Sequence, residues 1–355
     1  MSQPQLVLVT GITGFIAGHI FDQLLEAGYR VRGTARASKL PRLTALNIPN
    51  AEFVHVEDLA KDDMTGILQD VDVVIHTAAP LPGHQSPEDT LKTAHDGTLN
   101  IVKQAHQAGI TKIIVTETFG NAMDPSLVPG FAGITIKDSD WGTVTKEDFL
   151  KNVANPFYTY FAAKNLAEQA LWAYVDNVNK SEGGGGGLDV TTLLPGFVFG
   201  PYSKLLPKPT SAKELGTNLY PYMVMTGRVP PGPAPPFVVD VRDVARAHVR
   251  AISLPPASSS TTRKRFLLNG GNYTWLQTAQ DLATRTDLLH SRKVQIADFD
   301  EFPKMPGVVS VLDTQGAREV LGMEFVEPRR TMRDVVDELV GLVEVWEGRE
   351  RREVN

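Results

Sequence analysis

The sequence predicts an α/β fold, a doubly wound parallel sheet with a smaller lobe on its C-terminal side. Three observations lead to this prediction. An apolar run at residues 6–10 breaks into glycines, and a helical pattern follows at once. Short apolar runs then alternate with helical patterns through the N-terminal half, which is typical of a sheet covered by helices on both faces. After Leu194 the pattern becomes irregular, and nine of the 24 prolines lie between residues 201 and 236.

The strands of the large sheet are expected at Leu6–Thr10, Tyr29–Thr34, Glu52–Val56, Asp72–His76, Lys112–Thr116 and Val190–Leu194. Most of them are short apolar runs with β-branched residues, as expected when both faces of a strand are buried. Helical periodicity predicts two long helices in the same half of the chain, at about Pro87–Ala108 and Pro156–Val178.

The C-terminal half is expected to hold two more strands and three helices, in the order Phe237–Val239, Val241–Ile252, Arg265–Leu268, Thr274–Thr286 and Thr331–Trp346. We therefore expect two domains. Residues 1–195, with a returning segment at about 237–270, form the domain that contains the sheet. Residues 196–236 and about 271–355 form a smaller lobe over the carboxyl edge of the sheet, where such folds bind ligands.

Composition restricts the possible chemistry. The chain is 42% hydrophobic, which is ordinary for a globular protein, and its net charge of −6 argues against nucleic acid as a partner. The absence of cysteine excludes disulfides, thiolate metal sites and cysteine nucleophiles. The eight histidines show no metal-ligand spacing, so we expect no metal. No apolar run approaches the ~20 residues of a membrane helix and no leader pattern precedes the first strand, so we expect a cytoplasmic protein without a membrane partner.

Three glycines follow the first expected strand, at Gly11, Gly14 and Gly18. The first lets the chain turn off the strand, the second lets backbone approach a phosphate, and the third lets the helix pack on the sheet. The start of the helix offers unpaired N–H groups and a partial positive charge to an anion. An ordinary turn could carry glycines too, but the strand–turn–helix context favours a dinucleotide cradle of the Rossmann type. We expect the cofactor to contact Gly11, Thr13, Gly14, Phe15 and Ile16.

The loop after the second expected strand indicates which dinucleotide binds. Proteins of this fold that bind NAD usually carry a carboxylate there for the ribose 2′-hydroxyl. Positions 27–51 hold no acidic residue, whereas Arg36 and Lys39 follow the strand. A guanidinium pairs with a 2′-phosphate through two hydrogen bonds, so we expect NADPH. Asp58 and Leu59, after the third strand, are expected at the adenine, although a turn or helix cap explains Asp58 nearly as well.

Tyr160 and Lys164 form the candidate catalytic pair. They lie four residues apart near the start of an expected helix, so their side chains share one face. Of the eight tyrosines, only Tyr160 has a lysine at this spacing. A nearby ammonium lowers a tyrosine pKa from about 10 by ~1–3 units, which helps the phenol to donate a proton to a carbonyl becoming an alkoxide. Such pairs are common on helix surfaces, but downstream of a dinucleotide cradle the pair indicates an oxidoreductase.

Together these motifs resemble the extended short-chain dehydrogenases/reductases. The resemblance is greatest to the dihydroflavonol-reductase-like branch, which includes fungal NADPH-dependent ketone and aldehyde reductases. The glycine turn and the Tyr–Lys pair are typical of the whole superfamily. The basic loop narrows the resemblance to this branch, as do the stretches Pro195–Pro201 and Phe237–His248. The similar segments extend from residue 5 to about 345.

The resemblance implies a role for each catalytic residue. Tyr160 would donate the proton, and Lys164 would hold the nicotinamide ribose and lower the pKa of the tyrosine. A hydroxyl after the fifth strand would polarise the substrate carbonyl. The family usually has two serines there, whereas this chain has Glu117 and Thr118. Thr118 matches the second, catalytic serine; its hydroxyl can make the same hydrogen bond, but its methyl group restricts rotation and crowds the pocket. The other interpretation of Thr118 is a hydroxyl that caps a turn.

The resemblance also implies further contacts. Small residues after the fourth strand let the cofactor pass, and the segment after the sixth strand flanks the nicotinamide. The implied cofactor contacts are Thr77, Ala78, Ala79, Pro195, Gly196 and Val198, and the implied substrate contacts are Pro80, Phe119 and Tyr202.

We therefore expect an enzyme, an NADPH-dependent carbonyl reductase in which hydride passes from nicotinamide C4 to a ketone or aldehyde and Tyr160 supplies the proton. Two alternatives stay open. A nucleotide-sugar epimerase or dehydratase on the same fold would need basic residues for a diphosphate, yet segment 196–236 is mostly neutral. A non-catalytic NADPH-binding sensor would have no use for Tyr160. The expected partner is a small carbonyl substrate whose identity the sequence does not give, and the chain is expected to be a monomer or homodimer.

Overall fold

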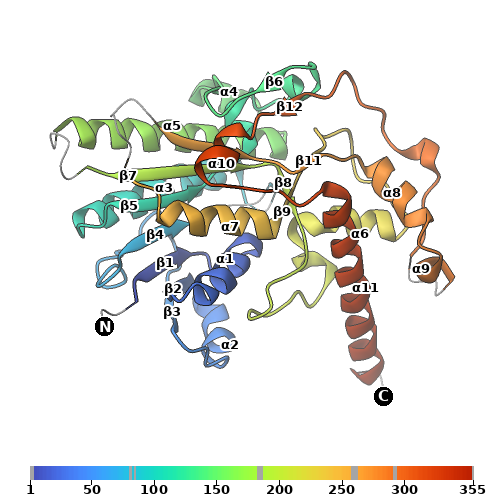
Figure 1. Ribbon diagram of the computed structural model, residues 1–355, viewed down its shortest axis with the longest axis horizontal. Helices are drawn as coiled ribbons and strands as arrows, with labels where there is room; N and C mark the ends of the chain where they lie inside the picture. The colour runs from blue at the N-terminus through green and yellow to red at the C-terminus, as the bar shows by residue number, and fades with distance from the viewer. Residues whose placement is uncertain are drawn as a thin grey trace.

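A computed structural model describes residues 4–79, 82–83, 85–181, 187–256, 263–290 and 294–353. Its largest element is a seven-stranded parallel sheet in the order β10-β7-β5-β4-β1-β2-β3 (Figure 1). The chain runs outward from β1 through β2 to β3, then returns to the other side of β1 with β4. This confirms the expected doubly wound fold. The reversal between β1 and β4 is the point at which such sheets bind nucleotides.

The strands of the large sheet lie close to their expected positions. They are β1 (Leu6–Thr10), β2 (Arg30–Ala35), β3 (Ala51–His55), β4 (Val73–His76), β5 (Lys112–Thr116), β7 (Asp189–Pro195) and β10 (Lys264–Leu268). Each expected strand agrees with the observed one to within one residue at either end. β1, β4 and β7 are buried along their whole length, as expected for central parallel strands.

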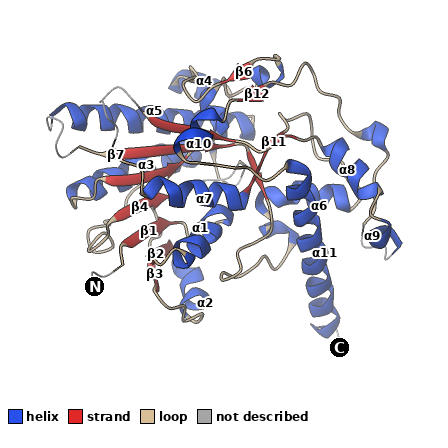
Figure 2. Ribbon diagram, in the orientation of Figure 1, coloured by secondary structure: helices blue, strands red, loops and turns tan. Residues whose placement is uncertain are grey.

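Helices cover both faces of the large sheet (Figure 2). One face packs against α1 (Phe15–Glu26), α7 (Val241–Ile252) and α10 (Gln315–Val320), and the other against α3 (Pro87–Gln107) and α5 (Pro156–Ser181). Alternation along β1 sends Val7 and Val9 into the first core and Leu6 and Leu8 into the second. The sheet is therefore held between two separate apolar layers.

A smaller unit lies beside the large sheet, on the right of Figure 1. Its strands form a sheet in the order β11-β9-β8, from β8 (Phe197–Phe199), β9 (Phe237–Asp240) and β11 (Gly271–Asn272). Its helices are α6 (Leu219–Met225), α8 (Trp275–Ala283), α9 (Thr286–His290) and α11 (Pro328–Glu353). α6, α8 and α11 share a core of their own, which includes Val224, Leu282 and Leu339. The remaining short elements are α2 (Leu40–Thr44), α4 (Lys146–Lys151) and the two-stranded sheet of β6 (Thr135–Ile136) and β12 (Val311–Leu312).

Some elements cross the expected domain boundaries. β9 lies in the small sheet, although the segment from residue 237 was expected to return to the large one. Ala317 and Leu321, expected in the lobe, pack into the core of the large sheet. The helix expected at Thr274–Thr286 is divided into α8 and α9. The backbone N–H and the hydroxyl of Thr284 both donate to the carbonyl oxygen of Asp281, and α8 ends there. The division into two domains stays a prediction.

In the part of the chain that the structure describes, none of the helices has the length and apolar character needed to cross a bilayer.

Candidate active site

The turn after β1 packs against the residues that follow β4, so the carboxyl ends of these two strands lie together. Gly11 has a φ of +67°, and a Cβ at this position would lie 2.9 Å from Cβ of Ala78, so a side chain does not fit. Thr10 ties the same strand ends together. Its Oγ1 lies 2.8 Å from Nδ1 of His76 and accepts hydrogen bonds from the N–H groups of Thr77 and Ala78. The expected cofactor residues of the two strands are therefore adjacent.

The first turn of α1 is open to an anion. Gly14 is the N-cap residue, and no described side chain accepts a hydrogen bond from this turn. The turn begins with Phe15 and Ile16 and contains no acidic residue. Its backbone N–H groups and the positive end of the helix dipole are thus available to a phosphate, in the place where the sequence predicts the pyrophosphate.

Gly18 has a different role from the one expected. A Cβ at Gly18 would lie 3.0 Å from Cβ of Ser203 and 3.7 Å from Leu206, so its nearest neighbours belong to the segment after β8. The prediction that this glycine packs on the sheet is wrong. One turn later, Asp22 accepts hydrogen bonds from the hydroxyl of Ser203 and the N–H of Lys204, both at 2.8 Å. α1 is thereby fixed to the segment that leads into the smaller unit.

Arg36 and Lys39 lie exposed in the loop after β2, and their contact with a 2′-phosphate stays a prediction. One carboxylate lies beside them. Glu57, just after β3, accepts hydrogen bonds from the ring of His55 and the N–H of Ala37. The loop after β2 itself holds no carboxylate, as the sequence predicts, and Glu57 reaches it from the segment after β3.

The structure gives Asp58 a role in a turn. Its Oδ1 accepts a hydrogen bond from the N–H of Ala60 at 3.0 Å, and its Oδ2 lies 3.4 Å from the ammonium of Lys61. The carbonyl oxygen of Leu59 accepts a hydrogen bond from Nδ2 of Asn100 at 2.9 Å. Contacts of Asp58 and Leu59 with an adenine stay a prediction.

Tyr160 and Lys164 lie near the start of α5, where this helix packs against the segment after β5. Lys164 is buried, and its Nζ donates a hydrogen bond to the carbonyl oxygen of Thr116 at 2.9 Å. The Tyr160 ring is half-buried and packs on Phe161, with 5.2 Å between ring centroids. A Cβ at Gly120 would lie 2.2 Å from Phe161, so this glycine is what lets the two segments approach.

Thr118 lies in the segment that α5 contacts. Its side chain is 5% exposed, and its Oγ1 accepts a hydrogen bond from the N–H of Gly120 at 3.3 Å. The hydroxyl therefore caps the short turn Phe119–Ala122. Among the described residues no acceptor takes its proton, so the same hydroxyl can still donate to a substrate oxygen. Both interpretations of Thr118 are compatible with this geometry.

The structure corrects the expected electrostatics of Tyr160. Burial raises the pKa of Tyr160 above its usual value, and the negative charge of Glu117 raises it further. The ammonium of Lys164 lies 2.9 Å from Oε2 of Glu117. The negative charge of Glu117 therefore offsets the positive charge that was expected to lower the pKa of the phenol. The prediction of a lowered pKa is therefore wrong. Sequence reasoning missed this ion pair, although a carboxylate beside the candidate threonine was a signal for it.

The residues expected near the nicotinamide lie at the carboxyl end of β7. Pro195 ends this strand, and Gly196 donates its N–H to the carbonyl oxygen of Leu268 at 2.9 Å. A Cβ at Gly196 would lie 2.9 Å from the carbonyl oxygen of Phe237, so the small sheet approaches closely here. Val198, in β8, is buried. These residues share the sheet edge with the turn after β1.

The structure corrects one of the three expected substrate contacts. Phe119 is 1% exposed, and its ring contacts Phe161, Phe197 and Phe237 at centroid distances of 5.4, 5.2 and 5.3 Å. It is a core residue, so its expected place at the substrate is wrong. Tyr202 is half-buried and donates its hydroxyl to the carbonyl oxygen of Leu215, and its substrate contact stays a prediction. Pro80 lies outside the described residues.

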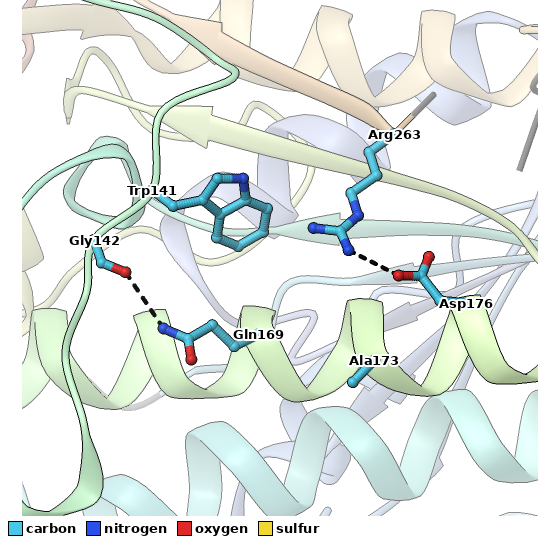
Figure 3. Close-up of a pocket in the computed structure, with 6 residues that line it drawn as sticks. All are labelled: Trp141, Gly142, Gln169, Ala173, Asp176 and Arg263. Carbon is cyan, nitrogen blue, oxygen red and sulfur yellow. Dashed lines mark hydrogen bonds and ion pairs between the residues drawn. The ribbon is translucent and has the colours of Figure 1, made fainter. Parts of the chain in front are cut away.

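A surface groove of about 390 Å³ lies on another part of α5 (Figure 3). It is lined by Trp141, Gly142, Gln169, Ala173, Asp176 and Arg263. Its two charged groups pair with each other, because the guanidinium of Arg263 lies 2.7 Å from the carboxylate of Asp176. The same guanidinium lies over the ring of Trp141, 5.3 Å from its centroid. Tyr160 and Lys164 do not line it, so this groove is not the candidate active site.

Comparison with known proteins gives one family and several reductases. The chain matches the model of the NAD dependent epimerase/dehydratase family over residues 7–262. The ketoreductase azaE of Aspergillus niger is 31% identical over 353 residues, which cover 94% of this chain and 97% of that protein. The structure of Gre2 from Candida albicans in complex with NADPH has a TM-score of 0.77 and 26% identity, and covers 96% of this chain and 99% of that one. The structure of the yeast methylglyoxal/isovaleraldehyde reductase Gre2 with NADPH has the same coverage, a TM-score of 0.79 and 24% identity. At this identity the similarity shows a shared fold.

Proposed function

Because the chain belongs to the NAD dependent epimerase/dehydratase family, we propose that it is an NADPH-dependent reductase of ketones or aldehydes. The ketoreductase azaE and the NADPH complex of Candida albicans Gre2 support this activity. The observation that carries the proposal is the contact between two segments at the carboxyl side of the sheet. One segment, after β5, carries Thr118, and the other, at the start of α5, carries Tyr160 and Lys164. In a sheet with this strand order, a dinucleotide binds at the carboxyl ends of β1 and β4.

The residues present fit a phosphorylated dinucleotide. The glycine turn leaves no room for a side chain at Gly11, the first turn of α1 is uncapped, and Arg36 and Lys39 are exposed where the 2′-phosphate is expected. The turn and the helix start would hold the pyrophosphate, and the basic loop would hold the 2′-phosphate. When bound, NADPH supplies the hydride that the carbonyl carbon accepts.

The chain's own residues supply the proton and the orientation. The hydroxyl of Thr118 donates a hydrogen bond to the carbonyl oxygen, and Tyr160 gives its proton to that oxygen as the alkoxide forms. Lys164 is held by the carbonyl oxygen of Thr116 and by Glu117, so its position relative to Tyr160 is fixed. Since burial and Glu117 raise the pKa of Tyr160, the phenol is protonated at neutral pH, which is the form that reduction requires.

We also propose that the substrate is a small carbonyl compound and that the chain acts in the cytoplasm as a monomer or homodimer. Segment 196–236, next to the expected substrate site, carries few charges, which favours an uncharged substrate over a nucleotide sugar.

The proposal is tested by measuring NADPH oxidation with aldehydes, diketones, aryl ketones and dihydroflavonols, each repeated with NADH. We expect the Tyr160→Phe variant to lose turnover by roughly 10²–10⁴-fold while its affinity for NADPH stays unchanged. Tyr158→Phe is the matched control, because Tyr158 lies on the same helix turn without a lysine four residues later. Full turnover by Tyr160→Phe contradicts the mechanism. A wild-type protein that reduces none of these carbonyls, and that is purified with bound NAD, contradicts the activity.

A further inference from the structure

Glu117 is a fully buried carboxylate in direct contact with the catalytic lysine. The side chains of Glu117 and Lys164 are 0% and 3% exposed, and Oε2 lies 2.9 Å from Nζ. Oε2 also accepts a hydrogen bond from Nδ2 of Asn121 at 3.0 Å. The other oxygen, Oε1, is buried and receives no hydrogen bond from the described residues. The carboxylate therefore depends chiefly on Lys164 for compensation of its charge.

A second buried carboxylate, Glu168, lies one turn along α5 from Lys164 and has its own counter-ion. It accepts hydrogen bonds from Nε of Arg265 at 2.9 Å and from the hydroxyl of Thr192 at 2.8 Å. Nδ2 of Asn121 donates to it at 2.9 Å, so this amide lies between the two carboxylates. With Glu117 ionised, the cluster contains two cations and two anions and is neutral overall.

The other titratable groups around Glu117 do not change this balance near neutral pH. His76 comes from β4, and burial and then the charge of Lys164 lower its pKa to about 3. His248 comes from α7, and burial lowers its pKa to about 4. Both rings are therefore neutral at pH 7. Among the described residues, the remaining groups are Tyr160, Lys164 and Glu168 on α5 and Arg265 on β10.

We propose that Glu117 is a positioning residue that neutralises Lys164 and keeps the proton on Tyr160, so that the site favours reduction of carbonyls over oxidation of alcohols. This inference rests on the proposed function. Reduction requires the phenol of Tyr160 as a proton donor, and alcohol oxidation requires the phenolate as an acceptor. A neutral side chain at position 117 would leave the ammonium of Lys164 uncompensated, and this positive charge would favour the phenolate.

The electrostatics of Tyr160 and of Glu117 agree with this assignment. The charge of Glu117 raises the pKa of Tyr160 in addition to the effect of burial. The pKa of Glu117 itself is raised to about 7, chiefly by burial. The positive charge of Lys164 lowers this pKa, and the negative charge of Glu168 raises it. Above this value Glu117 is ionised, and its negative charge then opposes the loss of the Tyr160 proton. Glu117 leaves the equilibrium between carbonyl and alcohol unchanged and sets the pH at which each direction proceeds.

The test is the pH profile of both directions in wild type and Glu117→Gln. The amide keeps the shape of the side chain and an acceptor for Lys164 but removes the charge. We expect the alkaline limb of carbonyl reduction and the acid limb of alcohol oxidation to move to lower pH by roughly one to three units. Glu117→Asp, which restores a carboxylate, should return both limbs toward the wild-type values.

A second readout does not depend on turnover. The ionisation of Tyr160 is followed by tyrosinate absorbance, as the difference between each protein and the same protein carrying Tyr160→Phe. The Glu117→Gln difference curve should lie at lower pH than the wild-type curve. If wild type reduces no carbonyl, the proposed function fails, yet this titration still tests Glu117. Glu117→Ser, which is also neutral, is titrated in the same way if the glutamine variant does not fold.

Asp189→Asn is the matched control. Asp189 is a buried carboxylate paired with Lys112 and Lys264 at the start of β7, at the opposite edge of the sheet from Tyr160. Its loss should destabilise the fold without moving either pH profile. Profiles of Glu117→Gln that superimpose on wild type, or that move to higher pH, would overturn the proposal. A shift of similar size in Asp189→Asn would also overturn it, because the effect would then not come from position 117.

Discussion

The Gly11→Ala substitution tests whether the turn after β1 is the dinucleotide site. Gly11 has a φ of +67°, and the added Cβ would lie 2.9 Å from Cβ and 3.1 Å from Cα of Ala78. Since these atoms belong to the backbone or are fixed directly to it, the contact is relieved only if the ends of β1 and β4 move apart. We therefore expect this substitution to reduce both the stability of the fold and the affinity for NADPH.

The size of the effect follows from two contributions. A left-handed backbone costs an L-residue about 1–2 kcal/mol. Overpacking against a rigid neighbour typically adds about 1–3 kcal/mol, which gives a total of about 2–5 kcal/mol for Gly11→Ala. Gly28→Ala is the matched control, because Gly28 has a φ of +85° but nothing lies within 4 Å of its added Cβ. It should lose only the first contribution, about 1–2 kcal/mol.

Urea unfolding measures the stability of both variants, and fluorescence titration measures their affinity for NADPH. We expect the Kd of Gly11→Ala to rise by at least roughly tenfold, equivalent to about 1.4 kcal/mol, and the Kd of Gly28→Ala to stay at the wild-type value. Equal losses of stability in the two variants would refute the argument about the close approach of Ala78. An unchanged Kd in Gly11→Ala would refute the assignment of this turn to the cofactor.

Three further predictions concern the cofactor, the hydroxyl of Thr118 and the pH dependence of stability. Replacing both Arg36 and Lys39 by alanine should raise KM for NADPH by roughly tenfold or more and leave KM for NADH unchanged, because only NADPH carries the 2′-phosphate; equal effects on both cofactors would contradict this. Thr118→Val should lower kcat by roughly 10²-fold, whereas Thr118→Ser should keep or raise it, since serine retains the hydroxyl without the methyl group. Burial lowers the pKa of His248 from 6.5 to about 4, so the unfolded chain binds more protons between these values and stability falls as the pH drops through this window. Urea unfolding at pH 7 and pH 5 should show a loss on the order of 2 kcal/mol from this residue, and a smaller pH dependence in His248→Asn.

The elements with a strong local pattern could be predicted from the sequence. β1 and the start of α1 follow from an apolar run, glycines at a tight turn and helical periodicity, all within about 20 residues. The Tyr160–Lys164 pair follows from its helical spacing alone. The outer strands β2, β3 and β10 could be predicted because each is a short segment with apolar or β-branched residues between clear breaks.

Features that depend on contacts between distant segments could not be predicted. β8, β9 and β11 are two to four residues long, and their pairing in a separate sheet leaves no periodic signal. The role of Gly18 depends on Ser203, which lies far along the chain. The raised pKa of Tyr160 has the same origin, since it comes from burial and from the charge of Glu117, which lies just after β5 and pairs with Lys164 of α5. The effect of Glu117 is visible only once both segments are placed in space.

The transfer of hydride from the cofactor to the substrate is tested most directly with NADPH that carries deuterium on the transferable position of nicotinamide C4. The alcohol formed from a carbonyl that the enzyme reduces is then analysed by mass spectrometry and NMR. We predict one deuterium on the former carbonyl carbon with wild type, and no alcohol above background with Tyr160→Phe. An alcohol without deuterium, or labelled alcohol formed equally well by the variant, would contradict the account.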